Sequence, residues 1–262
     1  MNNTAIVIPT LGNPLNKAWI ESVASTITVI VVCDGDDALA IEGVTQIFSS
    51  RQGFSGAVNM GIRQAQQEGH QSVLVLNDDA IPESGCIERL ISEYVPEMGL
   101  LSPMIVEKDS VILGYNRSKW GRFRHAQNSK HAQYLPAVCL LMPSWARFDE
   151  RYVHGFEDFE LCRRFHQMGL PVRIEAGLRC FHHGGATLDR KSAAAQYGSS
   201  YGQLLFEGLR WSPMVLVLQC AHVFREGRDI ARFGAVCRAA FDYYWLRAVT
   251  MASPRAGSSK AK

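Results

Sequence analysis

The chain has 262 residues, 47% of them apolar and 20% charged, which suffices for one large α/β domain, alone or with an appendage. This composition excludes a fibrous protein, a disordered chain and a small scaffold held by disulfides. The formal net charge of +2 is divided unevenly: residues 201–262 carry nine Lys and Arg against four Asp and Glu, which leaves −3 on residues 1–200.

The cysteines and the N-terminus give expectations about the compartment. Seven cysteines are spread over the chain without a C-x-x-C pair, which favours reduced thiols in a cytoplasmic protein. The N-terminus enters a strand-like run, so no secretory signal is expected. The longest apolar stretch, 213–224, is shorter than the roughly 20 residues of a membrane span. Attachment to the inner face of a membrane stays open.

The first hundred residues alternate apolar runs with helical patterns. Four runs are apolar throughout and predict strands buried on both sides, at 5–8, 27–32, 44–48 and 72–76. Helical patterns cover 14–25, 55–67 and 82–94, the last beginning with a proline. This alternation predicts a parallel sheet with helices on both faces. Ligands bind beyond the carboxyl ends of such strands, here at 9–13, 33–37, 49–56 and 77–80.

The pattern changes after residue 99. Strand-like pieces at 100–106, 111–115 and 133–142 surround a polar loop, 116–130, which carries Arg117, Lys119, Arg122 and Arg124. A helix follows at 155–168, then two short strands at 172–174 and 178–181. Residues 186–249 are expected to be helical and amphipathic, and 253–262 to be disordered.

Two acidic segments lie at predicted strand ends. Asp78 and Asp79 are adjacent, and two carboxylates there repel each other and lose hydration unless a cation balances them. Such oxygens suit Mg²⁺ or Mn²⁺ bound together with substrate phosphates, although a solvated turn is an equally good interpretation. Asp34 is placed to accept hydrogen bonds from a base or ribose, or it lies in an exposed Asp-Gly turn.

Three further motifs suggest contacts with a ligand. Glycines at 53, 56 and 61 precede or enter a helix and permit close backbone approach, but their spacing fits neither the dinucleotide nor the P-loop fingerprint. Glu157 and Asp158 follow Gly155 at a helix start, where a general base is plausible. His182 and His183 precede two glycines, which suits a metal or phosphate contact or a structural role.

Six motifs occur in an order that resembles glycosyltransferase family 2 with the GT-A fold, in particular its rhamnosyltransferase-like branch. The resemblance runs from about residue 5 to residue 187. The motifs are Val7-Ile-Pro-Thr10, Val31-Val-Cys-Asp34-Gly35, Gly53-Phe-Ser-Gly56 with Asn59 and Gly61, Leu76-Asn-Asp-Asp79, Gly155-Phe-Glu-Asp158 continuing to Arg163, and His182 before Gly184-Gly185.

The resemblance implies an α/β fold with a Rossmann-like mixed sheet, whose parallel N-terminal half is flanked by helices, and a helical C-terminal extension. We expect a catalytic domain at 1–190, divided into a nucleotide-binding half, 1–98, and an acceptor and catalytic half, 99–190. The helical extension then covers 191–252, and a disordered tail covers 253–262.

The resemblance also implies inverting transfer of a sugar from a dTDP-, UDP- or GDP-sugar to an acceptor hydroxyl, with a divalent cation, Mn²⁺ or Mg²⁺. Asp158 matches the catalytic base, with Glu157 as neighbour or substitute, and Asp79 and His182 match metal contacts. Asn77 departs from the acidic residue that many relatives have. The implied nucleotide-sugar contacts are Pro9, Thr10, Asp34, Arg51, Gly53, Gly56, Asn59, Asn77 and Asp78.

The expected acceptor is a surface polysaccharide, a lipid-linked glycan or a similar molecule. The alternative is a protein of the same fold that binds nucleotide sugars without catalysis. A nicotinamide dehydrogenase lacks its glycine fingerprint here, and no motif for reading nucleic acid is present. Arginines and aromatic residues interleave in the C-terminal third, which suits either a helix on an anionic membrane or helices packed on the catalytic domain or in a homodimer.

Overall fold

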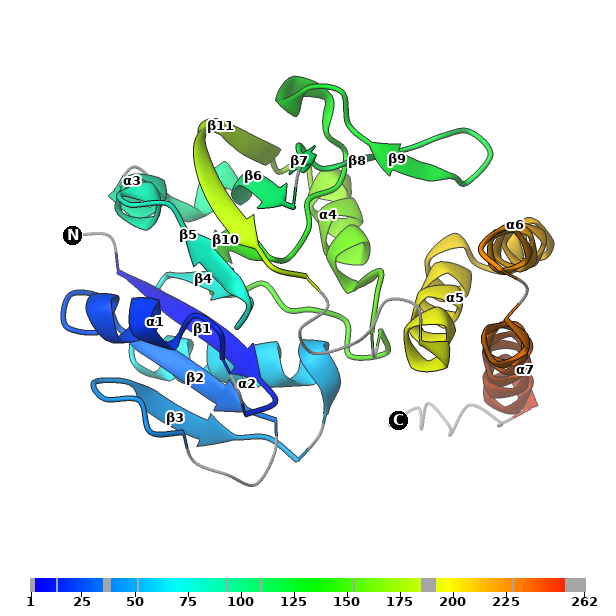
Figure 1. Cartoon of the computed structure of the whole chain (residues 1–262), viewed down its shortest axis with the longest axis horizontal. Coiled ribbons are helices and arrows are strands. Elements are labelled where there is room, and N and C mark those ends of the chain that lie inside the picture. The colour runs from blue at the N-terminus through cyan, green and yellow to red at the C-terminus, as the bar shows by residue number, and fades with distance from the viewer. Residues whose placement is uncertain are drawn as a thin grey trace, which may run out of the picture. The chain divides into compact units, whose positions relative to one another are not determined.

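A computed structural model describes residues 3–12, 14–34, 39–50, 52–92, 94–108, 110–152, 154–184, 192–227 and 229–252, with only the backbone of 248–252. The chain divides into two compact units, Met1–Asp189 and Arg190–Lys262. The first unit is a mixed sheet flanked by helices (Figure 1). This architecture confirms the predicted α/β fold class.

The sheet of the first unit has nine strands in the described part of the chain. Its order is β3-β2-β1-β4-β10-β6-β11-β5, and β7 pairs with β6. The strands are β1 (Thr4–Thr10), β2 (Val29–Cys33), β3 (Thr45–Phe48), β4 (Ser72–Leu76), β5 (Ala80–Pro82), β6 (Leu100–Glu107), β7 (Ser110–Ile112), β10 (Cys139–Pro143) and β11 (Val172–His182). β1, β2, β3 and β4 run parallel, whereas β10 lies antiparallel to β4 and β6.

The apolar strands have two buried faces because each face meets a different pair of helices. Ile6 and Ile8 of β1 pack in one cluster with α1 (Lys17–Val23) and α3 (Cys86–Ser92). Ala5 and Val7 pack in the other cluster with α2 (Gly53–Gln67) and α4 (Glu157–Gln167). Since side chains alternate along a strand, a run without polar residues is required to fill both cores.

β1 lies between β2 and β4, so the chain winds outward from β1 in both directions. Such a reversal of strand order opens a crevice beyond the carboxyl ends of the strands, where open α/β sheets bind ligands. Thr10 ends β1, Asp34 follows β2, and Asn77 follows β4. The fold therefore brings the two predicted acidic segments to the same edge of the sheet.

Several local predictions are wrong. Pro82 does not begin a helix: it ends β5, which pairs with β11, and α3 begins only at Cys86. The two predicted strands at 172–174 and 178–181 are one strand, β11, whose register shifts between Glu175 and Arg179. Pairing with distant strands decided both outcomes, and a local pattern does not show such pairing.

The predicted strand at 133–142 is shorter than expected, and the predicted basic loop is not a loop. Of the former, only Cys139–Pro143 forms β10. Within 116–130, β8 (Tyr115–Arg117) and β9 (Phe123–His125) form a hairpin, followed by the short 3-10 helix η2 (Ser129–His131). Aromatic side chains of this hairpin pack on α4, which supplies the apolar contact that a charged sequence did not suggest.

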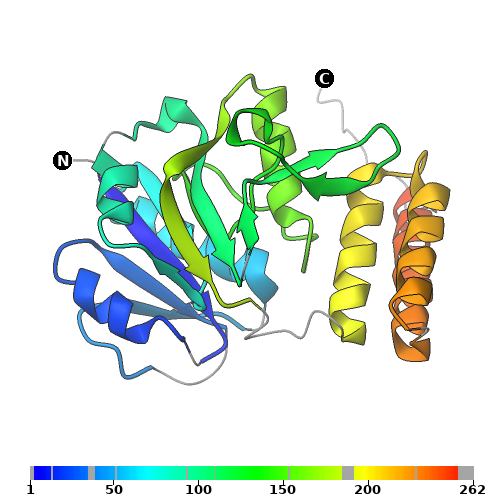
Figure 2. The ribbon, with the colours of Figure 1, turned by 45° about the horizontal axis from the view of Figure 1, so that its top comes forward.

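The second unit contains α5 (Ala193–Glu207), α6 (Ser212–Arg225) and α7 (Ile230–Ala252), which pack side by side (Figure 2). Leu204, Val215 and Tyr243 form their shared buried cluster. The predicted tail, 253–262, lies outside the described residues. In the described part of the chain, no helix is long and apolar enough to cross a membrane.

Gly61 of α2 gives a test of this packing. A Cβ at this position would lie 2.3 Å from Cγ1 of Val7 and 3.0 Å from Cγ2 of Val32. Both contacts are to stiff side chains of the sheet, so we expect Gly61→Ala to lower the free energy of unfolding by about 1–3 kcal/mol. Thermal and urea unfolding measure this change.

The matched control is Gly234→Ala in α7, where a Cβ meets nothing within 4 Å. Because alanine favours a helix over glycine, this variant should be more stable by about 0.5–1 kcal/mol. Equal effects of the two substitutions would contradict the close approach of α2 to the sheet.

Candidate active site

The acidic turn Asn77–Asp79 connects β4 to β5 and meets the end of β11. His182 of β11 lies opposite Ala80 in the β5 pairing, which places its imidazole beside the turn. Nε2 of His182 is 3.1 Å from Oδ1 of Asp79, and both side chains are buried. The His183 backbone N–H donates to the Asp79 carbonyl at 3.0 Å, while the His183 side chain is exposed. The sheet thus brings the carboxylate of Asp79 together with the side chain of His182 and not with the side chain of His183.

Asp78 is half-buried beside Asp79 and in contact with the end of β1. The Thr10 hydroxyl donates a hydrogen bond to its carboxylate and accepts one from the Gly12 N–H at 3.1 Å. Burial, followed by the charge of Asp79, raises the pKa of Asp78, while Thr10 and His182 oppose this rise. A positive charge in front of the turn would therefore stabilise the ionised form of Asp78.

Asn16, which the sequence analysis did not single out, holds the acidic turn in place. Its Nδ2 donates to the carbonyls of Asn77 and Ala80 at 3.0 and 2.9 Å, and its backbone N–H donates to the Asp78 carbonyl at 3.2 Å. Asn16 is buried, and no sequence signal marked it, because an asparagine before a helix has an ordinary capping role.

The residues of the turn fit a divalent cation only in combination with a ligand. In the described residues, no three His, Cys, Asp or Glu side chains are grouped to hold a metal. The Asp79 and His182 atoms, 3.1 Å apart, match two neighbouring ligands of an octahedral ion, which lie about 3 Å apart. Mg²⁺ commonly takes one or two protein ligands and completes its shell with phosphates and water. A buried Asn77 Oδ1 without a partner in the described residues leaves a further acceptor there.

Asp34 is buried and holds the start of α2. Its Oδ1 accepts hydrogen bonds from the Ser49 hydroxyl and from the Gln52 N–H, and its Oδ2 accepts one from the Gly53 N–H at 3.2 Å. Gly53 has a φ of +71°, which favours glycine. A carboxylate has about four acceptor positions, so three of those of Asp34 serve the fold and one remains for a ligand.

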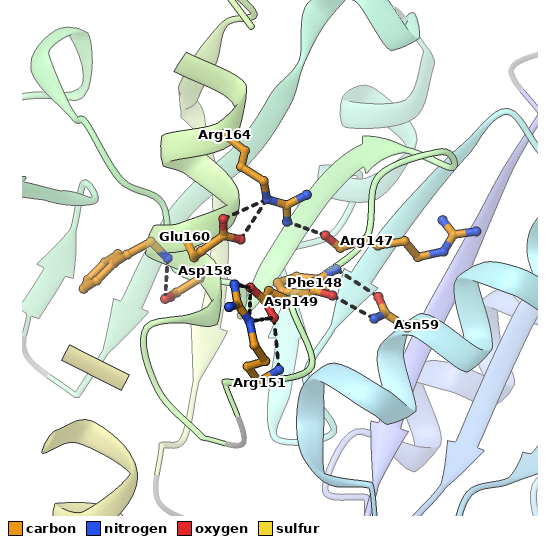
Figure 3. A network of polar contacts seen from close by, with 9 residues as sticks. Asn59, Arg147, Phe148, Asp149, Arg151, Asp158, Glu160 and Arg164 are labelled. Atoms are coloured by element: carbon orange, nitrogen blue, oxygen red, sulfur yellow. Dashed lines mark hydrogen bonds and ion pairs between the residues drawn. The ribbon is translucent and has the colours of Figure 1, made fainter. Parts of the chain in front are cut away.

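Asn59 of α2 binds the chain between β10 and α4 instead of facing the crevice. Its amide exchanges hydrogen bonds of 2.9 Å with both backbone groups of Phe148 (Figure 3) and donates another to Glu150. The Ser55 hydroxyl donates to the Tyr152 carbonyl at 2.9 Å. Both donors and one acceptor position of Asn59 are therefore used, so its amide positions the segment before α4.

An ion pair between the buried Glu160 and the half-buried Arg164 holds the other side of this segment. Oε1 and Oε2 of Glu160 accept hydrogen bonds of 2.9 and 2.8 Å from Nε of Arg164, one turn along α4. Arg164 in turn donates to the Arg147 carbonyl (Figure 3). Glu160 therefore orients Arg164, which anchors the segment to α4 at the Arg147 carbonyl.

The acid pair Glu157 and Asp158 begins α4 after a left-handed residue. Phe156 has a φ of +71°, a conformation that costs a non-glycine residue about 1–3 kcal/mol. Its ring packs edge-on against Phe123 of β9 and Phe159 of α4, with centroids 5.2 and 5.1 Å away. The hairpin thereby stabilises the backbone turn that presents the two carboxyl groups.

The two carboxyl groups have different surroundings. The Phe159 N–H, at 2.8 Å, and the Ala137 N–H donate to Asp158, whereas Oε2 of Glu157 is buried without a partner in the described residues. Burial raises the pKa of Asp158 to about 6, and burial with the Asp158 charge raises that of Glu157 to about 8. The two groups titrate as a coupled pair, and the two N–H donors favour the negative charge on Asp158.

One dipeptide connects the acid pair to the acidic turn. The Ala137 N–H donates to Asp158, and the carbonyl of the next residue, Val138, accepts a hydrogen bond of 2.9 Å from the Asn77 N–H. Consecutive Cα atoms are about 3.8 Å apart, so both segments are anchored at almost the same point. The acid pair and the acidic turn therefore share one edge of the sheet.

The remaining predicted contacts are placed as follows. Pro9 is buried in β1 opposite Val32, and Gly56 lies buried in α2, where a Cβ would meet Gln52. Arg51 and Gly185 lie outside the described residues. A cavity of about 440 Å³ opens at the amino ends of β2 and β3, at the other end of these strands from Asp34, so it is not part of this site.

Comparisons with known proteins agree on this class of fold. The profile of Glycosyl transferase family 2 matches residues 6–139. None of the curated protein sequences matches the chain significantly.

Three solved structures resemble this chain. A197 from STIV is 10% identical, with a TM-score of 0.42, and the match covers 69% of this chain and 85% of that protein. Mannose-1-phosphate geranyltransferase from Thermus thermophilus is 15% identical, with a TM-score of 0.40, and the match covers 70% of this chain and 74% of that protein. Inositol-1-phosphate CTP transferase from T. maritima is 10% identical, with a TM-score of 0.39, and the match covers 69% of this chain and 88% of that protein. These weak likenesses carry no argument about function.

Asn16→Ala tests the anchorage of the acidic turn. The substitution leaves the Asn77 and Ala80 carbonyls without their donor, so we expect a loss of about 1–3 kcal/mol in the free energy of unfolding. Urea unfolding measures the loss. Ser22→Ala on the exposed side of α1 is the control and should change stability by less than about 0.5 kcal/mol. Equal stability of the two variants would show that Asn16 does not hold the turn.

The acid pair predicts how stability depends on pH. The pKa of Glu157 rises from 4.5 to about 8 on folding, so between these values the folded protein binds more protons than the unfolded one. Stability should therefore fall as pH rises through this window. Glu157→Gln removes the titration and should flatten the fall, as measured by melting temperatures from about pH 5 to about pH 9. Parallel profiles for the two proteins would contradict the burial of Glu157.

Proposed function

Since this chain belongs to glycosyl transferase family 2, we propose that it transfers a sugar from a nucleoside diphosphate to an acceptor hydroxyl with inversion at the anomeric carbon. A surface polysaccharide or a lipid-linked glycan is the proposed acceptor, and a rhamnosyl or related hexosyl group the proposed cargo. In this proposal residues 1–98 bind the nucleotide, and residues 99–190 bind the acceptor and supply the base.

The observation that supports this proposal most is the common anchorage at Ala137 and Val138. It joins Asp158, whose carboxylate two backbone N–H groups hold, to the turn that carries Asp78 and Asp79. Inverting transfer requires a proton acceptor near the acceptor oxygen and a positive charge near the leaving diphosphate. The two segments supply groups for both requirements.

Asp158 is the proposed general base. Two backbone N–H groups hold its carboxylate in place and favour its charged form. It takes the proton of the acceptor hydroxyl as that oxygen bonds to the anomeric carbon and the bond to the diphosphate breaks. Burial and the charge of Asp158 raise the pKa of Glu157, which favours its neutral form as the neighbour of the base. A single displacement of this kind inverts the anomeric centre without a covalent enzyme intermediate.

The donor side consists of Thr10, Asp34, Asp78, Asp79 and His182. Asp79 and His182 would hold a divalent cation together with the diphosphate, and this ion would stabilise the charge that develops on the leaving group. The remaining acceptor position of Asp34 and the Oδ1 of Asn77 are available to the donors of a ribose or base.

The proposal is tested with nucleotide binding and turnover. Thermal unfolding with UDP, GDP or dTDP, each with and without Mn²⁺, should show one nucleotide that stabilises the wild type only when the metal is present. Asp79→Asn should abolish that metal-dependent shift. Glu88→Gln, on the exposed side of α3, is the control and should retain it. An equal thermal shift with and without Mn²⁺ would contradict the assignment of Asp79.

Asp158→Asn separates catalysis from binding. Removing a general base lowers the rate by about 10²–10⁴-fold, so hydrolysis of the matching sugar nucleotide should fall by this factor. The metal-dependent thermal shift should remain. A wild-type protein that binds the sugar nucleotides but neither transfers nor hydrolyses them would instead support a binding protein without catalysis.

A further inference from the structure

The three helices of the second unit distribute their side chains in an unusual way. Their interior contains a polar network: Gln196 donates to Ser200 and Gln219, Gln219 donates to Gln203, and Arg232 donates to Gln196. Arg232, at 5% exposure, also pairs with Glu226. A solvated bundle normally places its large apolar residues inside and its polar residues outside.

Large apolar side chains lie on the opposite, outward side of α6 and α7. Ile230, Phe241 and Trp245 of α7 are 87%, 63% and 60% exposed. We use the term outer apolar face for the exposed residues Met214, Val217, Phe224, Ile230, Phe233, Phe241, Tyr244 and Trp245.

The helical repeat shows that this exposure is systematic. In α7, the buried side chains of Arg232, Val236, Ala239 and Tyr243 follow one another at intervals of three or four residues. The exposed side chains of Ile230, Phe233, Cys237, Phe241 and Tyr244 follow the same repeat on the other side of the helix. The helix is therefore apolar outward along most of its length.

Basic residues border this face, and the acidic residues near it are already engaged. The segment Arg190–Lys262 contains eleven Lys and Arg against four Asp and Glu, and five of these basic residues lie in the part that the structure describes. Asp229 accepts from N–H groups at the start of α7, Asp242 accepts from the Tyr197 hydroxyl and lies 3.7 Å from Arg238, and Glu226 pairs with Arg232. Arg225 and Arg238 are exposed beside the apolar residues.

We propose that the outer apolar face of α6 and α7 binds an anionic lipid surface. An interfacial helix of this type places its aromatic and aliphatic residues at the boundary of the acyl chains, about 5–10 Å deep, and its arginines among the anionic headgroups. Trp245 and Tyr244 have the amphipathic rings that favour this boundary.

A second copy of the chain is a less suitable partner for the same face. In a two-fold dimer the outer apolar face packs against the same face of the other copy, so the arginines of the two copies would approach one another. The described helices present no row of exposed acids that could pair with these arginines. An anionic surface satisfies the apolar side chains and the surplus positive charge together. This inference does not depend on the proposed sugar transfer, since it concerns only the helices of the second unit.

The experiment is co-sedimentation of the full chain with lipid vesicles. Wild type should bind vesicles of phosphatidylcholine that contain about one third phosphatidylglycerol, and bind pure phosphatidylcholine much more weakly. Binding should weaken in high salt, because salt screens the headgroup charge. The variant with Phe241→Ser and Trp245→Ser should bind at least about tenfold more weakly, and Arg225→Ala about fivefold.

Trp120→Ser is the matched control, since Trp120 in the first unit is 56% exposed, close to the value for Trp245. It should leave vesicle binding unchanged, and circular dichroism should show that every variant retains its helices. Absence of binding to the anionic vesicles, or an equal loss in Trp120→Ser, would overturn the proposal. The proposal would also be overturned if the wild type were a dimer that does not bind vesicles and that the Phe241 and Trp245 substitutions dissociate.

Discussion

The placement of two adjacent carboxylates at the end of a buried strand is the constraint on which the site depends. Asp78 and Asp79 repel each other and lose hydration, and the pKa of Asp78 rises accordingly. The fold holds them there with the Thr10 hydroxyl, the His182 imidazole and the amide of Asn16. These contacts offset the electrostatic cost of placing two carboxylates together, and in the proposed function a cation that binds with the nucleotide would offset it further.

The second half of the site depends on a segment that is itself held from two sides. Asn59 of α2 and the Glu160–Arg164 pair of α4 fix the chain between β10 and α4, and the aromatic hairpin stabilises the left-handed Phe156. Asn59 and Glu160 lie within the motifs of the family resemblance, and in this structure they hold other residues in position. We expect substitution of Asn59 or Glu160 to displace Asp158 through this segment.

The second unit follows a different physical logic from the first. In the first unit, apolar side chains fill two clusters on either side of the sheet. In the second, glutamine and arginine side chains share the helix interfaces with a small apolar cluster, while many large apolar residues of α6 and α7 are exposed. Buried polar networks fix the register of helices more than they stabilise them, which leaves the apolar residues available for an external surface.

The sequence by itself determined the parallel half of the sheet, the positions of the acidic turn and the acid pair, and the family, because strand periodicity and motif order are local properties. Tertiary structure alone decided that Pro82 ends an edge strand, that Asn59 serves the fold, and that Asn16 holds the turn. It also decided how the acid pair is held, since Asp158 accepts a hydrogen bond from the N–H group of Ala137, in a different segment of the chain. Contacts between distant segments set hydrogen bonding and burial, and no local pattern records which segments will meet.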